Sequence, residues 1–71
     1  MIDVADLNNR FQYHPPRGDQ AARYQIIRSN AGSLAHLINQ NAPDSREKGL
    51  AITHLEEAVM WANAAIARNH E

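Results

Sequence analysis

The sequence predicts an all-α protein in which a short N-terminal helix precedes an antiparallel hairpin of two long helices. Apolar residues recur at steps of three and four along two long stretches, and a short turn containing Pro43 separates these stretches. Between residues 58 and 67 only Asn63 is polar, so this part of the second helix has no polar face. A helix that is apolar all round has to be covered all round, which predicts a homo-oligomer. The 71 residues are sufficient for one domain, spanning residues 1–71.

The N-terminal part is expected to contain a short helix over residues 1–10 and an extended connector over residues 11–18. Ile2, Val4 and Leu7 are the apolar anchors of this helix, which is too short to be stable alone. Pro15 and Pro16 exclude a helix in the connector, and Gly18 permits a turn there.

The first long helix is predicted over residues 19–40. Asp19 is suited to the N-cap position, where a side-chain oxygen can accept a hydrogen bond from a free backbone N–H. The helical period appears as a stripe of five residues: Tyr24, Ile27, Ala31, Leu34 and Ile38.

The second long helix is predicted over residues 44–69. Asp44 is expected as its N-cap, and Glu47 three residues later completes a capping-box pattern. The stripe that would face the first helix consists of Ile52, Leu55, Val59, Ala62 and Ile66. A second stripe of small residues, which allows close approach of another helix, consists of Ala51, Ala58 and Ala65.

Composition excludes several classes of function. The chain has no cysteine, which rules out disulfides and thiolate metal sites. The net charge of −1 gives no broad attraction to long nucleic acids or anionic membranes. No apolar run reaches membrane-spanning length and no signal peptide is recognisable, so an intracellular protein is expected.

Catalytic and metal chemistry are poorly supported. The serines have no nucleophile context, so we expect no enzymatic activity and no cofactor. His54 and Glu57 are three residues apart on one helix face, a spacing used in carboxylate-bridged metal bundles. The further carboxylates of such a site are missing, so no metal is expected.

A site for a small anion is better supported by the residues. Six of the seven basic residues are arginines, whose planar guanidinium groups suit phosphate and can stack on bases. Tyr13 and His14 lie on the connector, and Arg28 lies beside the stripe of the first long helix. Tyrosine and arginine together offer stacking and phosphate contacts to a nucleotide. The alternative is that Tyr13 only packs the connector against the hairpin, which the pattern alone favours.

Five stretches together resemble a known family: residues 11–16 (FQYHPP), 23–24 (RY), 27–28 (IR), 43–47 (PDSRE) and 55–68 (LEEAVMWANAAIAR). They are similar to the helical hairpin domain of phage immune-evasion sponges, the anti-CBASS cyclic-nucleotide sponges and the related hairpin of one anti-Thoeris group. The resemblance covers about residues 11–69.

This resemblance implies a compact helical homo-oligomer, a hexamer in the anti-CBASS branch, that binds signalling nucleotides without cleaving them. Cyclic dinucleotides would lie between protomers, and some members of the family also hold cyclic trinucleotides in separate pockets. It implies that Tyr13 stacks on the ligand, that Arg28 holds phosphate and that His14 lines the pocket. Where some relatives have a charged residue for trinucleotides, this chain has Ala64 or Asn63, which either removes trinucleotide binding or shifts that role to Arg46 or Arg68.

The expected function is therefore sequestration of a cyclic nucleotide messenger in the cytoplasm of an infected bacterium, which would block CBASS-type signalling. One alternative is a structural or protein-interaction module built on the same hairpin. Another is a sponge for a cyclic ADP-ribose-type signal.

Overall fold

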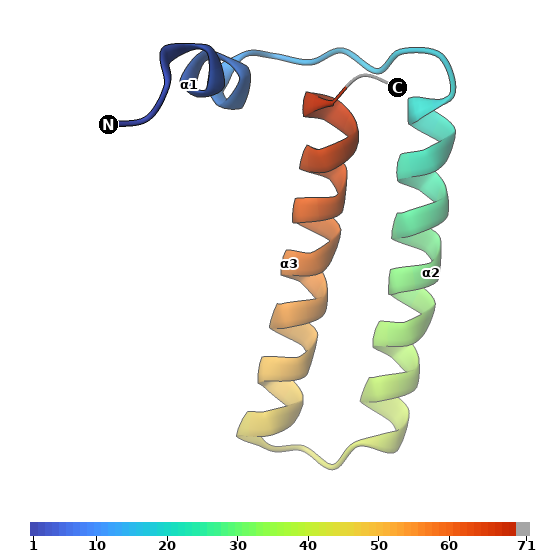
Figure 1. Ribbon diagram of the computed structural model, residues 1–71. Helices are drawn as coiled ribbons and strands as arrows, with labels where there is room; N and C mark the ends of the chain where they lie inside the picture. The colour runs from blue at the N-terminus through green and yellow to red at the C-terminus, as the bar shows by residue number, and fades with distance from the viewer. Residues whose placement is uncertain (70–71) are drawn as a thin grey trace.

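A computed structural model describes residues 1–69, which form three helices: α1 (Val4–Phe11), α2 (Gln20–Asn41) and α3 (Arg46–Arg68). The described residues contain no strand, which confirms the all-α prediction. α2 and α3 run antiparallel as a hairpin, and α1 extends sideways from its open end (Figure 1).

The two long helices pack through the predicted stripes, with one exception. Ile52, Leu55, Val59, Ala62 and Ile66 are all half-buried along α3. On α2 the half-buried apolar and aromatic positions are Tyr24, Ile27, Ala31, Ala35 and Ile38, whereas Leu34 is 46% exposed. The prediction that Leu34 belongs to the stripe is wrong. Ala35, four residues after Ala31, faces α3 in place of Leu34. Leu34 is one residue earlier in the helix and therefore points about 100° away from that contact.

The start of α3 differs from the prediction. Its N-cap is Ser45, whose Oγ accepts a hydrogen bond from the Lys48 backbone N–H at 3.1 Å. Asp44 lies outside the helix and pairs with Lys48 Nζ at 2.9 Å. Glu47 is only two residues after Ser45, so the expected capping box does not form. The hydroxyl of Ser45 takes the capping role because the extended backbone at that residue directs its short side chain back to the first turn.

At the start of α2, Asp19 occupies the predicted N-cap position but makes no side-chain capping bond. Its carboxylate lies 3.4 Å from Arg23 Nε instead. The Gln20 side chain accepts from the Arg17 backbone N–H at 3.0 Å and donates to the Ile66 carbonyl at 3.1 Å. Gly18 makes the turn before it with φ of +53°, a left-handed conformation that glycine adopts without strain. Gln20 thus fastens the connector to the end of α3.

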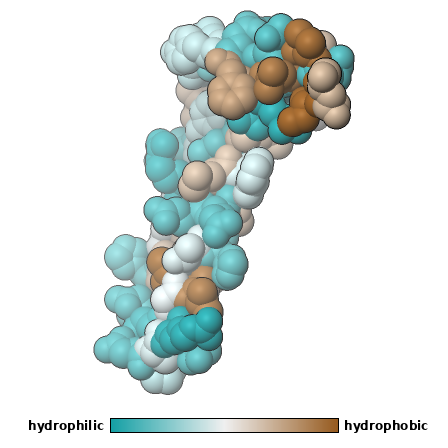
Figure 2. Space-filling view, turned by 90° about the vertical axis from the view of Figure 1, so that its left-hand side faces the viewer, coloured by the Kyte–Doolittle hydropathy of each residue, from teal (hydrophilic) through white to brown (hydrophobic). Residues whose placement is uncertain are grey.

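The short helix α1 leaves its apolar side chains exposed. The helix spans Val4–Phe11 instead of residues 1–10, because Asp3 precedes its first turn as the N-cap. Ile2, Val4, Leu7 and Phe11 are exposed, Phe11 to 83%. Figure 2 shows apolar side chains gathered at this end of the molecule. Nothing within the described part of the chain covers this face.

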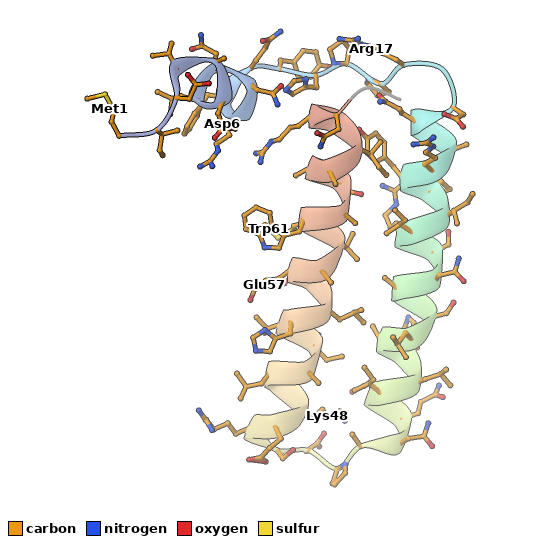
Figure 3. The ribbon with its side chains drawn as sticks, in the orientation of Figure 1. Met1, Asp6, Arg17, Lys48, Glu57 and Trp61 are labelled. Carbon is orange, nitrogen blue, oxygen red and sulfur yellow. The ribbon has the colours of Figure 1, made fainter. Side chains whose placement is uncertain are left out.

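The protomer is too thin to enclose a core. Among residues 1–69 no side chain is fully buried, and the accessible surface is 5706 Å². A compact protein of 8.0 kDa has about 4,450 Å². The radius of gyration is 15.4 Å, against about 11 Å for a globular chain of this length. Trp61 projects from α3 on the side away from α2 and is 68% exposed (Figure 3).

Candidate functional site

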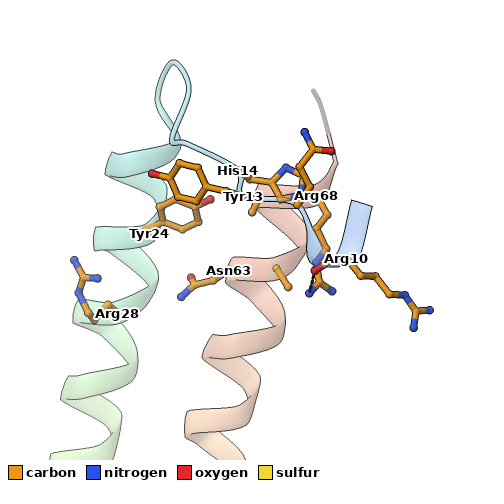
Figure 4. Close-up of a pocket in the computed structure, with 10 residues that line it drawn as sticks. Arg10, Tyr13, His14, Tyr24, Arg28, Asn63 and Arg68 are labelled. Carbon is orange, nitrogen blue, oxygen red and sulfur yellow. Dashed lines mark hydrogen bonds between the residues drawn. The ribbon is translucent and has the colours of Figure 1, made fainter. Parts of the chain in front are cut away.

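A pocket of about 440 Å³ lies at the open end of the hairpin. The end of α1, the connector, the N-terminal part of α2 and the C-terminal part of α3 all contribute to it (Figure 4). Pockets for small ligands typically measure about 300–1,000 Å³. Its lining consists of Arg10, Gln12, Tyr13, His14, Tyr24, Arg28, Asn63, Ala64, Ala67 and Arg68.

Two tyrosine rings provide the flat apolar surface of the pocket. Tyr13 comes from the connector and is 79% exposed, whereas Tyr24 comes from α2 and is half-buried. Both rings lie on the α2 side in Figure 4. Rings that are open on one face can stack on a nucleobase.

Asn9 holds the connector in place at the junction of three segments. Its backbone carbonyl accepts a hydrogen bond from His14 Nε2 at 2.7 Å. Its side-chain Nδ2 donates to the Arg68 carbonyl at 3.1 Å. Asn9 therefore joins α1, the connector and the end of α3, and it fixes the segment that carries Tyr13.

Three arginines line the pocket, and they differ in their partners. Arg10 pairs with Asp6 at 3.0 Å, and Arg68 donates to the Arg10 carbonyl at 3.5 Å. Arg28 donates to the neutral amide oxygen of Gln25 and has no carboxylate partner among residues 1–69. Neither Arg28 nor Arg68 has a carboxylate partner among residues 1–69, so both guanidinium groups can bind an anion.

Asn63 projects from α3 toward α2 at the bottom of the pocket (Figure 4). The residue is half-buried, and its Oδ1 atom is fully buried without a hydrogen-bond donor in the described part of the chain. Buried polar atoms of folded proteins almost always have a partner. The pocket therefore contains one unpaired acceptor, beside two guanidinium groups without a carboxylate partner among residues 1–69.

A second, more apolar groove of about 360 Å³ follows the middle of the hairpin. Arg28 lies at the boundary of both hollows. The groove contains Gly32, and a methyl group added there would meet nothing within 4 Å. Gly32 therefore marks no close contact within the protomer.

With this geometry in place, the comparisons with known proteins identify the family. The family model described as the Acb2/Tad1 hairpin domain matches residues 3–67. The chain belongs to the Acb2/Tad1 hairpin-domain family. This is the family of anti-CBASS and anti-Thoeris sponges, phage proteins that bind cyclic nucleotides, so the resemblance seen in the sequence is confirmed. No curated protein and no solved structure matches the chain significantly.

Five of the six residues predicted for the site of this Acb2/Tad1 hairpin line the same pocket: Tyr13, His14, Arg28, Asn63 and Arg68. Arg46 is the first residue of α3 and lies at the loop end, so the structure does not bring it to the pocket. The helix is 23 residues long, which separates its two ends by about 33 Å.

Sequence reasoning missed several lining residues, chiefly Arg10 and Tyr24. Tyr24 precedes Arg28 by four residues, a spacing that places both on one helix face and was available as a signal. No sequence signal places Arg10, because its position depends on how α1 meets the end of α3.

The pair of His54 and Glu57 lies on α3, outside the pocket lining. His54 Nδ1 lies 3.7 Å from Glu57 Oε1, but residues 1–69 contain no cluster of three or more potential metal ligands. Within the same range, no helix has the length and hydropathy needed to cross a bilayer.

Proposed function

We propose that this protein is a phage sponge that binds a cyclic di- or trinucleotide messenger and withholds it, uncleaved, from CBASS-type effectors in the cytoplasm of the infected bacterium. One observation carries the proposal: two tyrosine rings and the unneutralised Arg28 line a single pocket. Membership of the Acb2/Tad1 family supports it independently.

The pocket chemistry matches the two parts of a nucleotide. A base stacked on Tyr13 or Tyr24 gains about 1–3 kcal/mol per base. A phosphate bound by Arg28 gains a charge-assisted hydrogen bond of about 1.5–3 kcal/mol. The lining contains no aspartate or glutamate, so the pocket accepts an anion without repulsion from a carboxylate.

The titratable groups of the pocket support storage of the ligand in place of turnover. His14 is the one histidine among the lining side chains. Its Nε2 is engaged by the Asn9 carbonyl, and arginine does not exchange protons in proteins. With one histidine and no aspartate or glutamate, the lining offers little for acid–base cleavage of a phosphodiester, which supports storage.

We further propose that the sponge is a homo-oligomer, with a hexamer as the expected form. The surface exceeds that of a compact 8.0 kDa protein by about 1,250 Å², more than the area of about 800 Å² that each partner buries in a standard interface. The exposed residues include Phe11, Met60 and Trp61. Tyr13 is also exposed, so a base stacked on it keeps one open face that a second protomer can cover.

Titration calorimetry with a panel of cyclic di- and trinucleotides and a cyclic ADP-ribose isomer tests the binding. At least one cyclic nucleotide should bind, and at 100 times its dissociation constant it should add about 2.7 kcal/mol to the free energy of unfolding. The ligand should be recovered intact after heat release. Absence of binding across the panel refutes the function, and linear product that increases with protein concentration refutes storage.

Light scattering at micromolar concentration tests the assembly, with Ala58→Glu as the disrupting variant. Ala58 is exposed in the protomer, so the substitution leaves the α2–α3 contact intact, whereas a charge buried in an interface has no partner. Thr53→Glu, on the polar part of α3, is the matched control. A folded monomer for the unmodified chain would refute the assembly.

A further inference from the structure

Asn63 interrupts the apolar half of α3 at the face that packs on α2. It follows Val59 by four residues and precedes Ile66 by three, and both of these are half-buried stripe residues. A leucine or alanine would continue the stripe without a polar atom. The asparagine therefore needs an explanation beyond helix packing.

Among residues 1–69, Asn63 Oδ1 is the one buried side-chain polar atom without a hydrogen-bond partner. Four other asparagines donate from Nδ2 to backbone carbonyls at 2.8–3.1 Å: Asn9, Asn30, Asn41 and Asn69. Asn63 has no such bond, and its Oδ1 is buried without a donor in the described residues. A buried acceptor without a partner destabilises a protein, because it has lost its hydrogen bonds to water. Such a group calls for a partner from outside the protomer, which a bound ligand can supply.

The neighbouring groups restrict what that ligand group can be. Arg28 in the same pocket offers donors, which suit phosphate oxygens. Phosphate oxygens only accept hydrogen bonds, so they cannot satisfy Asn63 Oδ1. A nucleobase on the tyrosine rings carries N–H donors at its edge, and the Asn63 side chain already lines that space.

Resting on the sponge function proposed above, we propose that Asn63 reads an adenine base of the bound nucleotide. Rotation of the side chain turns Oδ1 into the pocket, where it accepts from the exocyclic amine while Nδ2 donates to the adjacent ring nitrogen. This pairing of asparagine with adenine uses one donor and one acceptor on each side. Selection of adenine requires that the base presents its N6/N7 edge to Asn63, because guanine presents only the acceptors N7 and O6 on that edge and leaves Oδ1 unpaired. Asn63 therefore selects adenine-containing messengers.

The test compares cyclic di-AMP with its analogue in which purine replaces adenine, so that only the exocyclic amines are lost. The unmodified protein should bind the analogue roughly 10- to 100-fold more weakly. Asn63→Leu should bind both ligands with similar affinity, because it cannot recognise the amine. Asn41→Leu is the matched control, since it removes a bonded, exposed amide at the loop end and should preserve the preference.

The ligand-free thermal midpoint separates recognition from a structural role. Asn63→Leu removes an unpaired buried acceptor, so its midpoint should equal or exceed that of the unmodified protein. A lower midpoint, equal binding of both ligands by the unmodified protein, or preference for cyclic di-GMP over cyclic di-AMP would overturn the inference. If the leucine variant does not fold, the comparison of the two ligands on the unmodified protein still decides whether the pocket recognises the exocyclic amine.

Binding of cyclic nucleotides without adenine preference refutes this inference alone, whereas absence of any binding refutes the sponge function.

Discussion

The two ends of the hairpin differ in how their polar groups are used. At the loop end, Lys48 Nζ donates to Asp44 at 2.9 Å and to the Asn39 carbonyl at 2.8 Å, and Ser45 caps α3. The Lys48 side chain is only 12% exposed as a result. At the open end, Arg28 has no carboxylate partner among residues 1–69, and the Asn63 oxygen has no donor there.

This difference indicates a division of roles. Groups that satisfy one another stabilise the hairpin and have nothing left to offer a ligand. Groups that remain unpaired cost stability and are retained where a ligand completes them. Substitutions at the open end should therefore change binding, and substitutions at the loop end should change stability.

The largest effect is expected at Tyr13 and Arg28. Tyr13→Ala removes stacking worth about 1–3 kcal/mol per base, and Arg28→Ala removes about 1.5–3 kcal/mol of phosphate contact. If two protomers share one ligand, each loss counts twice and binding falls close to zero. Calorimetric titration beside the scattering mass measures both effects, and the mass of Arg28→Ala should not change.

Conservative variants are the controls for this pair. Tyr13→Phe keeps the ring and should retain most of the affinity, whereas Arg28→Lys keeps the charge without the planar fork and should retain part of it. If both alanine variants bind a cyclic dinucleotide as tightly as the unmodified protein does, the ligand lies outside this pocket.

A smaller effect, on stability alone, is expected at Ser45. Ser45→Ala removes the N-cap bond to the Lys48 N–H and should lower the free energy of unfolding by about 1 kcal/mol. Chemical denaturation measures this loss, and ligand affinity should be unchanged. Asp44→Ala is the comparison, because Asp44 was the cap expected from the sequence. A larger stability loss in Asp44→Ala than in Ser45→Ala would contradict the observed cap.

Midway between the two ends, Gly32→Ala should raise the free energy of unfolding by about 0.5–1 kcal/mol, since alanine favours helix and the new methyl meets no atom within 4 Å. Gly49→Ala in α3 is the matched control with equally open space. A loss of assembly in Gly32→Ala but not in Gly49→Ala would instead place another protomer in the apolar groove.

The smallest effect concerns pH. The hydrogen bond from Lys48 and its positive charge lower the pKa of Asp44 below its ordinary value. The pair therefore stabilises the folded state above the ordinary aspartate pKa, and this contribution is lost as pH falls through the lowered value. Because Asp44 is fully exposed, the change in stability is small. Carboxyl NMR titration should show the pKa returning toward normal in Lys48→Met, and an unchanged value would contradict the pairing.

Most of the hairpin could be predicted from sequence, because periodicity reports which face of a helix is apolar. The α3 stripe from Ile52 to Ile66 is half-buried throughout, as expected. The errors fall where local alternatives compete. Asp44 and Ser45 are adjacent and equally good caps by type, and only backbone geometry decides between them. Leu34 and Ala35 fit the period about equally, and the packing of α2 on α3 selects the smaller residue.

The site was less predictable than the helices. Tyr13 and Arg28 were chosen by chemistry and resemblance, and the structure places both on one pocket. Arg46 does not lie with them, because it begins the helix that Arg68 ends. The predicted length of this helix already implies that the two arginines lie far apart. The burial of Asn63 Oδ1 depends on the fit between two helices, which no pattern of residue types encodes.

The junction at Asn9 has a consequence for cooperativity. Asn9 bonds both to His14, beside Tyr13, and to the last residue of α3, so anything that immobilises α1 also immobilises the stacking ring. Free-energy coupling between two binding events is reciprocal. A neighbour docked on the apolar face of α1 would raise the affinity of the pocket for its ligand. A ligand bound in the pocket would raise the affinity for that neighbour by the same factor. In an assembly of such protomers, the first messenger captured would ease capture of the next.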